Sequence, residues 1–351
     1  MLRLRSVRFL LPGVASVALL AVSASGEPPA AQHSPARIFH FTTDGFWLNL
    51  HHFLYVLGRV EAGMPDIERR AVLRAPVDEE RGLDLLSAAE RETWRAAVGI
   101  YAAGPSRMDL VSDEKLLKMT NRLEGAEELE GLEIDPEWRV ALEQAAPQYR
   151  RVWWPEHRAM NRAWAGAMEA LLAEHGAAVL DFLLRAYGVT WPENGYPVHL
   201  SGYANWAGAY STFGDLLVIS SLDDPLRASL AGLELVFHEA AHQFDQVVVE
   251  ELVAAARDEG LRFGRGLDHA ILFFTAGEAV RSVFPAYVPY AHAHGVWNRG
   301  LADFLPALES GWRPYLEGES LGDEAARSSA LRAVLRALDE GSEPAPPDGD
   351  R

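Results

Sequence analysis

Apolar positions at helical spacing dominate the first half of the chain. They recur every three to four residues in five stretches, and this spacing places apolar side chains on one face of a helix. The predicted helices cover residues 46–60, 87–102, 113–129, 136–145 and 155–187, and the last is expected to break at Gly176. Residues 37–188 are therefore expected to form a helical region.

The pattern changes between residues 189 and 221. Gly, Pro and Asn there separate short runs rich in Val, Tyr, Trp and Ile, a composition typical of strands and turns. The runs 203–212 and 215–220 should pair as a hairpin across Phe213 and Gly214. We expect a small sheet in this segment.

Two helices follow the predicted sheet. Asp224 and Pro225 provide an N-cap and a proline at the first helical position, so the first helix should run from there to about Val248. The second should cover residues 268–284, with Asp268 as its cap and a proline directly after its end.

The first of these helices contains the sequence His-Glu-Ala-Ala-His at residues 238–242. Positions four apart share one face of a helix, so His238 and His242 can direct both imidazoles at one metal ion. Glu239 lies about 100° further round, where a carboxylate can deprotonate a metal-bound water. The spacing therefore supplies two metal ligands and a general base.

The same helix has a single polar stripe on an otherwise apolar surface. Glu234, His238, His242 and Asp245 form this stripe. Burying these groups would be costly without a shared partner, and a divalent cation is such a partner. We expect Asp245, ahead of Glu234, to orient one of the imidazoles.

A hydrolytic zinc site needs a third protein ligand. Glu278 is our first choice, because it lies in an almost wholly apolar helix and requires either coordination or an ion pair with Arg281. His269 is second. It lies nine residues before Glu278, half a turn out of phase, so the two side chains cannot easily reach one ion. Weaker candidates, assigned to helix ends or a surface loop, are Glu250, Glu251, His292 and His294.

The motif at 238–242, the downstream helical Glu278 and the predicted strand at 207–212 together resemble the zincin metallopeptidases, and among them the gluzincin branch. The resemblance covers roughly residues 198–290. The expected fold is α+β and mostly helical, with a zincin-like catalytic domain over residues 189–340 that carries a small mixed or antiparallel sheet. The helical region precedes this domain.

The resemblance also implies roles for individual residues. His238, His242 and Glu278 would hold one zinc ion, Glu239 would act as general base, and the exposed edge strand would bind an extended peptide. A Tyr or His stabilises the oxyanion in this family, and we expect Tyr290 to do so. The other candidates for this role are Tyr287, His269, Tyr210 and His199.

The amino-acid composition restricts the kinds of ligand and partner that the protein can bind. The chain has no cysteine, so disulfides and thiolate ligands are excluded and His, Asp or Glu must hold any metal. The formal net charge of -18 disfavours nucleic acid and anionic membrane surfaces as partners. The peptide or protein substrate that the resemblance implies remains the expected partner.

The amino-terminal segment resembles an export signal. Three arginines precede an apolar stretch over residues 9–22, and small residues follow around Ser25. The stretch is shorter than the ~20 residues that span a bilayer. We therefore expect cleavage of residues 1–25 and a periplasmic or extracellular protein without stable membrane association. The Pro-containing segments 26–36 and 341–351 are expected to be a flexible lead-in and tail.

Two other functions are compatible with the sequence. One is an exported binding or scaffold protein that keeps the zincin fold without turnover, and the other is a zinc hydrolase of a non-peptide amide. The helical region contains further histidines. We expect one of His51 and His52 to face inward as a hydrogen-bonded core residue, and we expect the same of His157 near the start of its helix.

Overall fold

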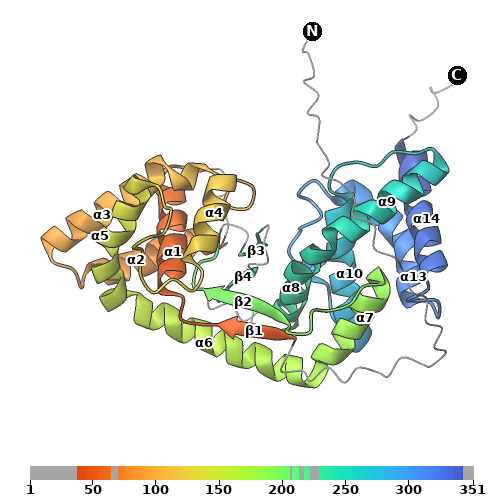
Figure 1. The fold of residues 1–351 in the computed structure, drawn as a ribbon, viewed down its shortest axis with the longest axis horizontal. Helices are drawn as coiled ribbons and strands as arrows, with labels where there is room; N and C mark the ends of the chain where they lie inside the picture. The colour runs from red at the N-terminus through yellow and green to blue at the C-terminus, as the bar shows by residue number, and fades with distance from the viewer. Residues whose placement is uncertain (1–37, 65–69, 206–207, 213–216, 222–228, 343–351) are drawn as a thin grey trace, which may run out of the picture. The chain divides into compact units, whose positions relative to one another are not determined.

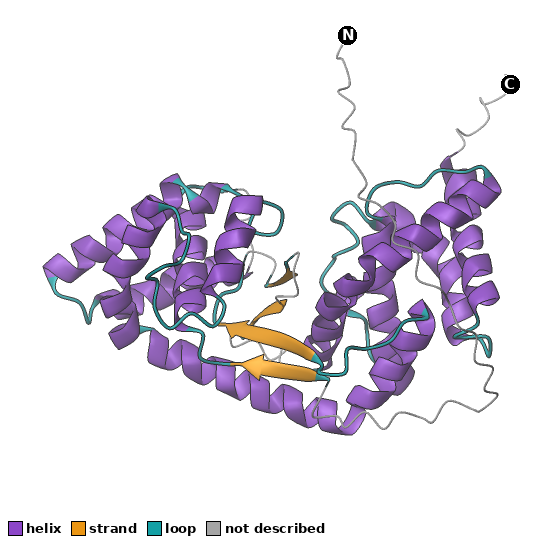
Figure 2. Cartoon of the chain, in the orientation of Figure 1, coloured by secondary structure: helices purple, strands orange, loops and turns teal. Residues whose placement is uncertain are grey.

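Helices dominate the fold, and the strands form one small sheet (Figures 1 and 2). The computed structural model describes residues 38–64, 70–205, 208–212, 217–221 and 229–342. The predicted class, α+β and mostly helical, is confirmed.

The sheet has four strands in the order β1-β2-β4-β3 (Figure 1). The strands are β1 (Phe39–Thr42), β2 (Tyr196–Ser201), β3 (Ala209–Ser211) and β4 (Leu217–Ser220). β2 pairs in parallel with both β1 and β4, whereas β3 pairs antiparallel with β4 and places Tyr210 opposite Val218. The predicted antiparallel pairing is therefore confirmed for shorter strands than expected, the predicted turn at Phe213 and Gly214 lies outside the described residues, and β3 is an edge strand.

Strand β1 corrects the prediction that residues 37–188 are helical throughout. Phe39 pairs with Tyr196 and Thr42 with His199, so the partner strand lies more than 150 residues away in the sequence. Four residues are too few to give a local period, and only the distant partner defines them as a strand.

The amino-terminal helices pack around α1 (Phe46–Glu61), most of whose residues are buried. The others are α2 (Arg70–Leu83), α3 (Ala88–Ala103), α4 (Glu114–Leu123) and α5 (Pro136–Val152). Ser87 caps α3 in a capping box with Glu90, and Asp113 and Asp135 cap α4 and α5. The sequence pattern located four of these helices and missed α2, which contains a proline.

A long helical segment runs past the sheet and joins the amino-terminal helices to the rest (Figure 1). It consists of α6 (Trp154–Leu171), a π-helical turn over Leu172–Gly176, and α7 (Ala177–Tyr187). The break predicted at Gly176 is this turn, through which the chain stays helical. A Cβ at Gly176 would lie 3.1 Å from Ile38 Cδ1, so close packing favours glycine there.

The carboxy-terminal part is helical. Its longer helices are α8 (Leu230–Ala241), α9 (Asp245–Glu259), α10 (Leu267–Val283) and α14 (Glu324–Ser342), and α11 (Tyr290–Ala293), α12 (Leu305–Ala307) and α13 (Arg313–Glu317) are short. The helix predicted to continue to Val248 instead ends as α8, and a 3₁₀ turn over His242–Phe244 redirects the chain into α9. The predicted cap at Asp224 and Pro225 lies outside the described residues. Gly266, with a φ of 93°, is the N-cap of α10 in place of Asp268.

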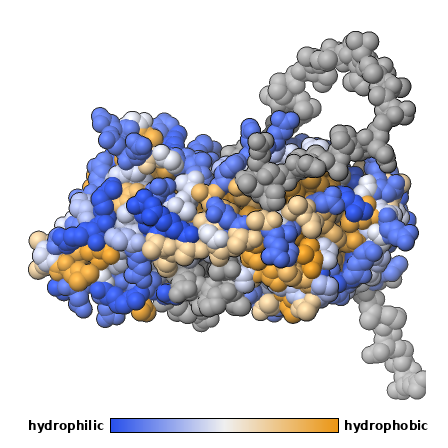
Figure 3. All heavy atoms as spheres, turned by 90° about the horizontal axis from the view of Figure 1, so that it is seen from below, coloured by the Kyte–Doolittle hydropathy of each residue, from blue (hydrophilic) through white to orange (hydrophobic). Residues whose placement is uncertain are grey.

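The sheet separates two apolar cores. Leu217 and Ile219 of β4 belong to the core built with α7, α8 and α10, whereas Val218 between them belongs to the core around α1. This alternation is the two-residue period of a strand covered on both faces. Polar side chains cover much of the surface of the amino-terminal helices, and apolar side chains gather on the other half of the face seen in Figure 3. Among the described residues, no helix is both long and apolar enough to cross a membrane.

Candidate metal centre

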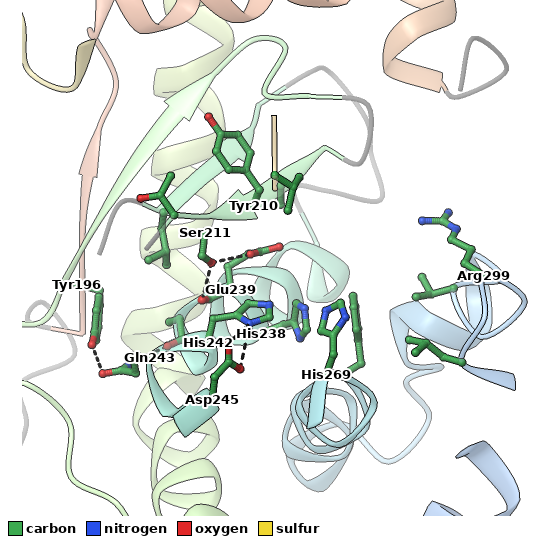
Figure 4. A pocket seen from close by; sticks show the side chains of 18 of the residues that line it. Tyr196, Tyr210, Ser211, His238, Glu239, His242, Gln243, Asp245, His269 and Arg299 are labelled. Carbon is green, nitrogen blue, oxygen red and sulfur yellow. Dashed lines mark hydrogen bonds and ion pairs between the residues drawn. The ribbon is translucent and has the colours of Figure 1, made fainter. Parts of the chain in front are cut away.

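A cavity of about 760 Å³ lies under the edge strand β3 (Figure 4). Its walls come from β3, the carboxy-terminal end of α8, the first turns of α10 and the turn after α11. The motif residues His238, Glu239 and His242 all line it. The cavity therefore brings the sequence motif together with the predicted substrate-binding strand.

Three histidines meet at the floor of this cavity. Each of His238, His242 and His269 offers a ring nitrogen within 4.8 Å of the others. The ring centroids are 5.0 Å apart for His238 and His242, 5.3 Å for His238 and His269, and 5.1 Å for His242 and His269. Imidazoles that share a tetrahedral zinc ion at usual Zn–N distances have centroids about 5 Å apart. The spacing of the three rings is therefore that of imidazoles that could share one metal ion.

His269, and not Glu278, lies beside the two motif histidines. Arg313 donates to the carboxylate of Glu278 over 2.9 Å, and Arg281 lies 3.1 Å from it. These ion pairs compensate the burial of Glu278, which is only 5% exposed. Because the two residues of α10 are half a turn out of phase, the face that presents His269 to α8 directs Glu278 elsewhere. The structure thus groups the second-ranked candidate, His269, with His238 and His242, and it pairs the first-ranked Glu278 with two arginines.

The weaker ligand candidates lie outside the cavity. Glu251 is in the middle of α9 and is paired with Arg327 over 2.8 Å, and Glu250 accepts from Gln246. His292 is on α11 and His294 follows it. None of these four side chains lines the cavity wall.

The protonation of two of the three histidines suits metal binding. Burial, together with the neighbouring imidazoles, holds the pKa of His238 well below its usual range, and burial lowers the pKa of His269 to about 4. Both rings are therefore neutral at neutral pH, and a metal ligand must be neutral. Burial opposes protonation of His242 as well, but Asp245 and Glu239 outweigh it and raise its pKa.

Asp245 orients His242. Its carboxylate lies 3.1 Å from Nδ1 of His242, which leaves Nε2 for a metal ion. The preference for Asp245 over Glu234 as the orienting carboxylate is confirmed, because Glu234 accepts hydrogen bonds from Tyr287 and from the backbone of Tyr290.

Glu239 is buried at the junction of α8 and β3 and lines the cavity. Ser211 Oγ lies 2.8 Å from Glu239 Oε2 and 2.9 Å from its backbone carbonyl, so the hydroxyl can donate to either. Burial raises the pKa of Glu239 more than His242 and Ser211 lower it. A carboxylate with its pKa moved toward neutrality is a better proton acceptor for a general base. The sequence reasoning did not identify Ser211.

The residues considered for stabilising the oxyanion lie in different parts of the structure. Tyr290, the preferred residue, does not line the cavity; its backbone N–H donates to Glu234 over 2.8 Å and its ring lies 4.3 Å from that of His294. Tyr287 also bonds Glu234, and His199 lies 2.8 Å from Glu124. Tyr210 and His269 do line the cavity. The structure therefore does not bring Tyr290 to the histidines.

Strand β3 is held in place by a histidine of α1. His52 is fully buried, with Nε2 2.6 Å from the Tyr210 hydroxyl and Nδ1 2.9 Å from Ser201 Oγ on β2. His51 and His157 likewise contact the buried hydroxyls of Tyr101 and Tyr149. The prediction of a hydrogen-bonded core residue is confirmed for His157, and the structure buries both His51 and His52 where only one of the two was expected inside.

Replacing His52 with alanine should therefore destabilise the protein by about 2–4 kcal/mol, because it leaves a cavity and two buried hydroxyls without their partner. Urea unfolding of His52→Ala, Tyr210→Phe and the double variant measures the coupling between the two side chains. The exposed His292→Ala serves as control. Additive effects of His52→Ala and Tyr210→Phe would contradict the assigned contact.

Glu234 should make stability depend on pH. The residue is fully buried, and burial raises its pKa to about 7 although Tyr287 donates to it. The folded protein then binds a proton that the unfolded chain has released, so stability falls as the pH rises from about 4.5 to 7. A shift of this size corresponds to about 3 kcal/mol.

The variant Glu234→Gln should not lose stability between about pH 4.5 and 7 in this way, and it should be more stable than the parent above pH 7. Urea unfolding at several pH values between 4.5 and 8 tests it, with the exposed Glu169→Gln as control. Parallel stability curves for Glu234→Gln and the parent would show that Glu234 is not the group responsible.

No protein-family model matches the chain, and no curated protein or solved structure matches it either. The resemblance to zincins therefore rests on the sequence motif and its neighbouring residues alone.

Proposed function

We propose that this protein is a zinc-dependent peptidase in which His238, His242 and His269 hold the ion and Glu239 is the general base. One observation carries the proposal: three histidines at metal-ligand spacing and a buried carboxylate line one cavity beneath the free edge of a strand. The motif is the one expected of a zincin, but the ligand set has a third histidine where the gluzincin branch would have a glutamate.

The three imidazoles are neutral ligands, so they would leave the charge of the cation undiminished. A zinc ion in such a site supplies a Lewis acid that polarises a carbonyl and lowers the pKa of water. Glu239 accepts a proton from the attacking water and returns it to the leaving amine. Ser211 fixes the carboxylate through its hydroxyl, and Asp245 fixes the ring of His242.

The edge of β3 provides a place for an extended substrate. The Gly208 carbonyl accepts from the Ser220 N–H, so Gly208 and Tyr210 should be the residues whose backbone groups bond to β4. Ala209 and Ser211 then direct their N–H and C=O groups to the free edge. A peptide that pairs with them adds a strand to the sheet, and its backbone recognition would be independent of side chains.

The proposal includes export. The amino-terminal residues that predict it lie outside the described part of the chain, so its support is the pattern of arginines, apolar residues and small residues in the sequence. A periplasmic or extracellular peptidase without cysteines would be indifferent to the oxidising conditions there.

A mixture of unrelated peptides tests the proposed function. The purified protein is loaded with zinc or stripped with a chelator, and the cleavage products are identified by mass spectrometry. We expect internal peptide bonds to be cleaved by the zinc-loaded protein and not by the stripped one. Stoichiometric zinc without cleavage of any peptide would instead support a binding protein or a hydrolase of another amide.

A further inference from the structure

Two arginines line the cavity on its α10 side. Arg265 lies in the loop between α9 and α10, four residues before His269, and Arg299 lies in the turn after α11. In Figure 4 Arg299 lies beyond His269, on the side of the histidines away from Ser211. A substrate that runs along β3 and over the histidines can therefore reach a cationic wall.

The two loops are packed against each other. A Cβ at Gly266 would lie 3.4 Å from Leu301, and one at Gly264 would lie 3.5 Å from Phe304. The backbone N–H of Arg299 donates to the carbonyl of Val296 over 2.9 Å, which closes the turn. These contacts of the neighbouring residues thus fix the backbone positions of Arg265 and Arg299.

The charges around the cavity are unevenly distributed. Among its acidic residues, Glu239 is bonded to Ser211 and Asp245 to His242. Asp109, from the amino-terminal part, accepts the backbone N–H of Val111 over 3.0 Å. Within the part of the chain that the structure describes, Arg265 has neither a hydrogen bond nor an ion pair. A protein with a net charge of -18 therefore presents the guanidinium of Arg265 at this wall without a compensating carboxylate among the described residues, and the guanidinium of Arg299 lines the same wall.

We propose that Arg265 and Arg299 form a carboxylate subsite and that the peptidase prefers substrates with a carboxylate on the segment beyond the histidines. Guanidinium groups bind carboxylates in a planar, two-point geometry that suits this role. The carboxylate can be the carboxy-terminus of a short peptide or the side chain of an aspartate or glutamate. This inference rests on the proposed function for its substrate class, but its binding test does not require turnover.

Binding is measured by calorimetry on the zinc-loaded Glu239→Gln protein, so that the peptides are not consumed. The first probe pair is acetyl-tetraalanine with a free carboxylate and the same peptide as a carboxamide. The second pair is the amidated acetyl-tetrapeptide with glutamate or glutamine at its third position. The first pair reports on a terminal carboxylate and the second on a side-chain carboxylate.

We expect the acid of at least one pair to bind about tenfold more tightly than its neutral partner, in keeping with charge-assisted hydrogen bonds at a partly exposed site. Arg265→Gln or Arg299→Gln, added to the same protein, should bring this ratio close to one. Arg262→Gln, in the same loop and exposed but outside the cavity wall, is the matched control and should keep it.

Equal binding of acid and neutral peptide in both pairs would overturn the subsite, as would a preference that survives both arginine variants. The values of kcat/KM for the same peptides with the zinc-loaded parent separate the two proposals. Cleavage without charge preference leaves the peptidase and removes the subsite. Charge-selective binding without cleavage leaves the subsite and removes the peptidase.

Discussion

Replacing Glu239 with glutamine is expected to slow peptide hydrolysis by orders of magnitude while leaving zinc in place. The change keeps the volume and the hydrogen bond from Ser211 but removes the basic oxygen. General acid–base catalysis typically contributes 10²–10⁴-fold, so kcat should fall by about that factor. Because Glu239 is not among the three ligands, the zinc content of the variant should equal that of the parent.

The control for this experiment is Glu250→Gln, an exposed carboxylate on α9 that does not line the cavity. It should retain full activity. Two results would contradict the role of Glu239. One is undiminished hydrolysis by Glu239→Gln, and the other is loss of bound zinc together with activity, which would place Glu239 among the ligands.

The second large effect is expected from replacing His269, the proposed third zinc ligand. His269→Ala should weaken zinc binding by more than about 100-fold, because even residues that only orient a ligand contribute 10–100-fold. Glu278→Gln should bind zinc as tightly as the parent, because its carboxylate pairs with Arg281 and Arg313. Competition with a chromophoric chelator measures both affinities.

The two variants should also differ in stability. Glu278→Gln removes the buried partner of two partly exposed arginines that keep ion pairs with Glu317, so its cost should stay below the value of about 3–5 kcal/mol that is typical of breaking a fully buried pair. Zinc binding is therefore compared under conditions where circular dichroism shows both proteins to be folded. Retention of zinc by His269→Ala with its loss in folded Glu278→Gln would restore the ligand set expected of the gluzincin branch.

The motif and its surroundings could be predicted because their signals are local. The spacing of His238 and His242 follows from one helical turn, and the orienting Asp245 is only three residues further along. The hairpin of β3 and β4 is likewise a contact between neighbours in the sequence. The apolar spacing also placed the starts of two helices, predicted at residues 87 and 136, within one residue of where α3 and α5 begin.

The features that the sequence pattern does not predict depend on contacts between residues far apart in the sequence. The spacing of His269 and Glu278 predicts that only one of them can face the motif histidines, because they lie on opposite faces of α10. Which one does so depends on Arg313, which pairs with Glu278 from 35 residues further along the chain. Ser211 acquires its role only because β3 lies against α8. Strand β1 exists only beside β2. In each case an interaction between remote segments determines the role.

Titration of the metal-free protein with zinc, with bound metal and peptide hydrolysis measured on the same samples, tests the central claim most directly. The three-histidine site predicts that activity rises in proportion to bound zinc and reaches its maximum at one ion per chain. Activity that is already present without zinc, or that stays absent when one zinc ion is bound, would contradict it.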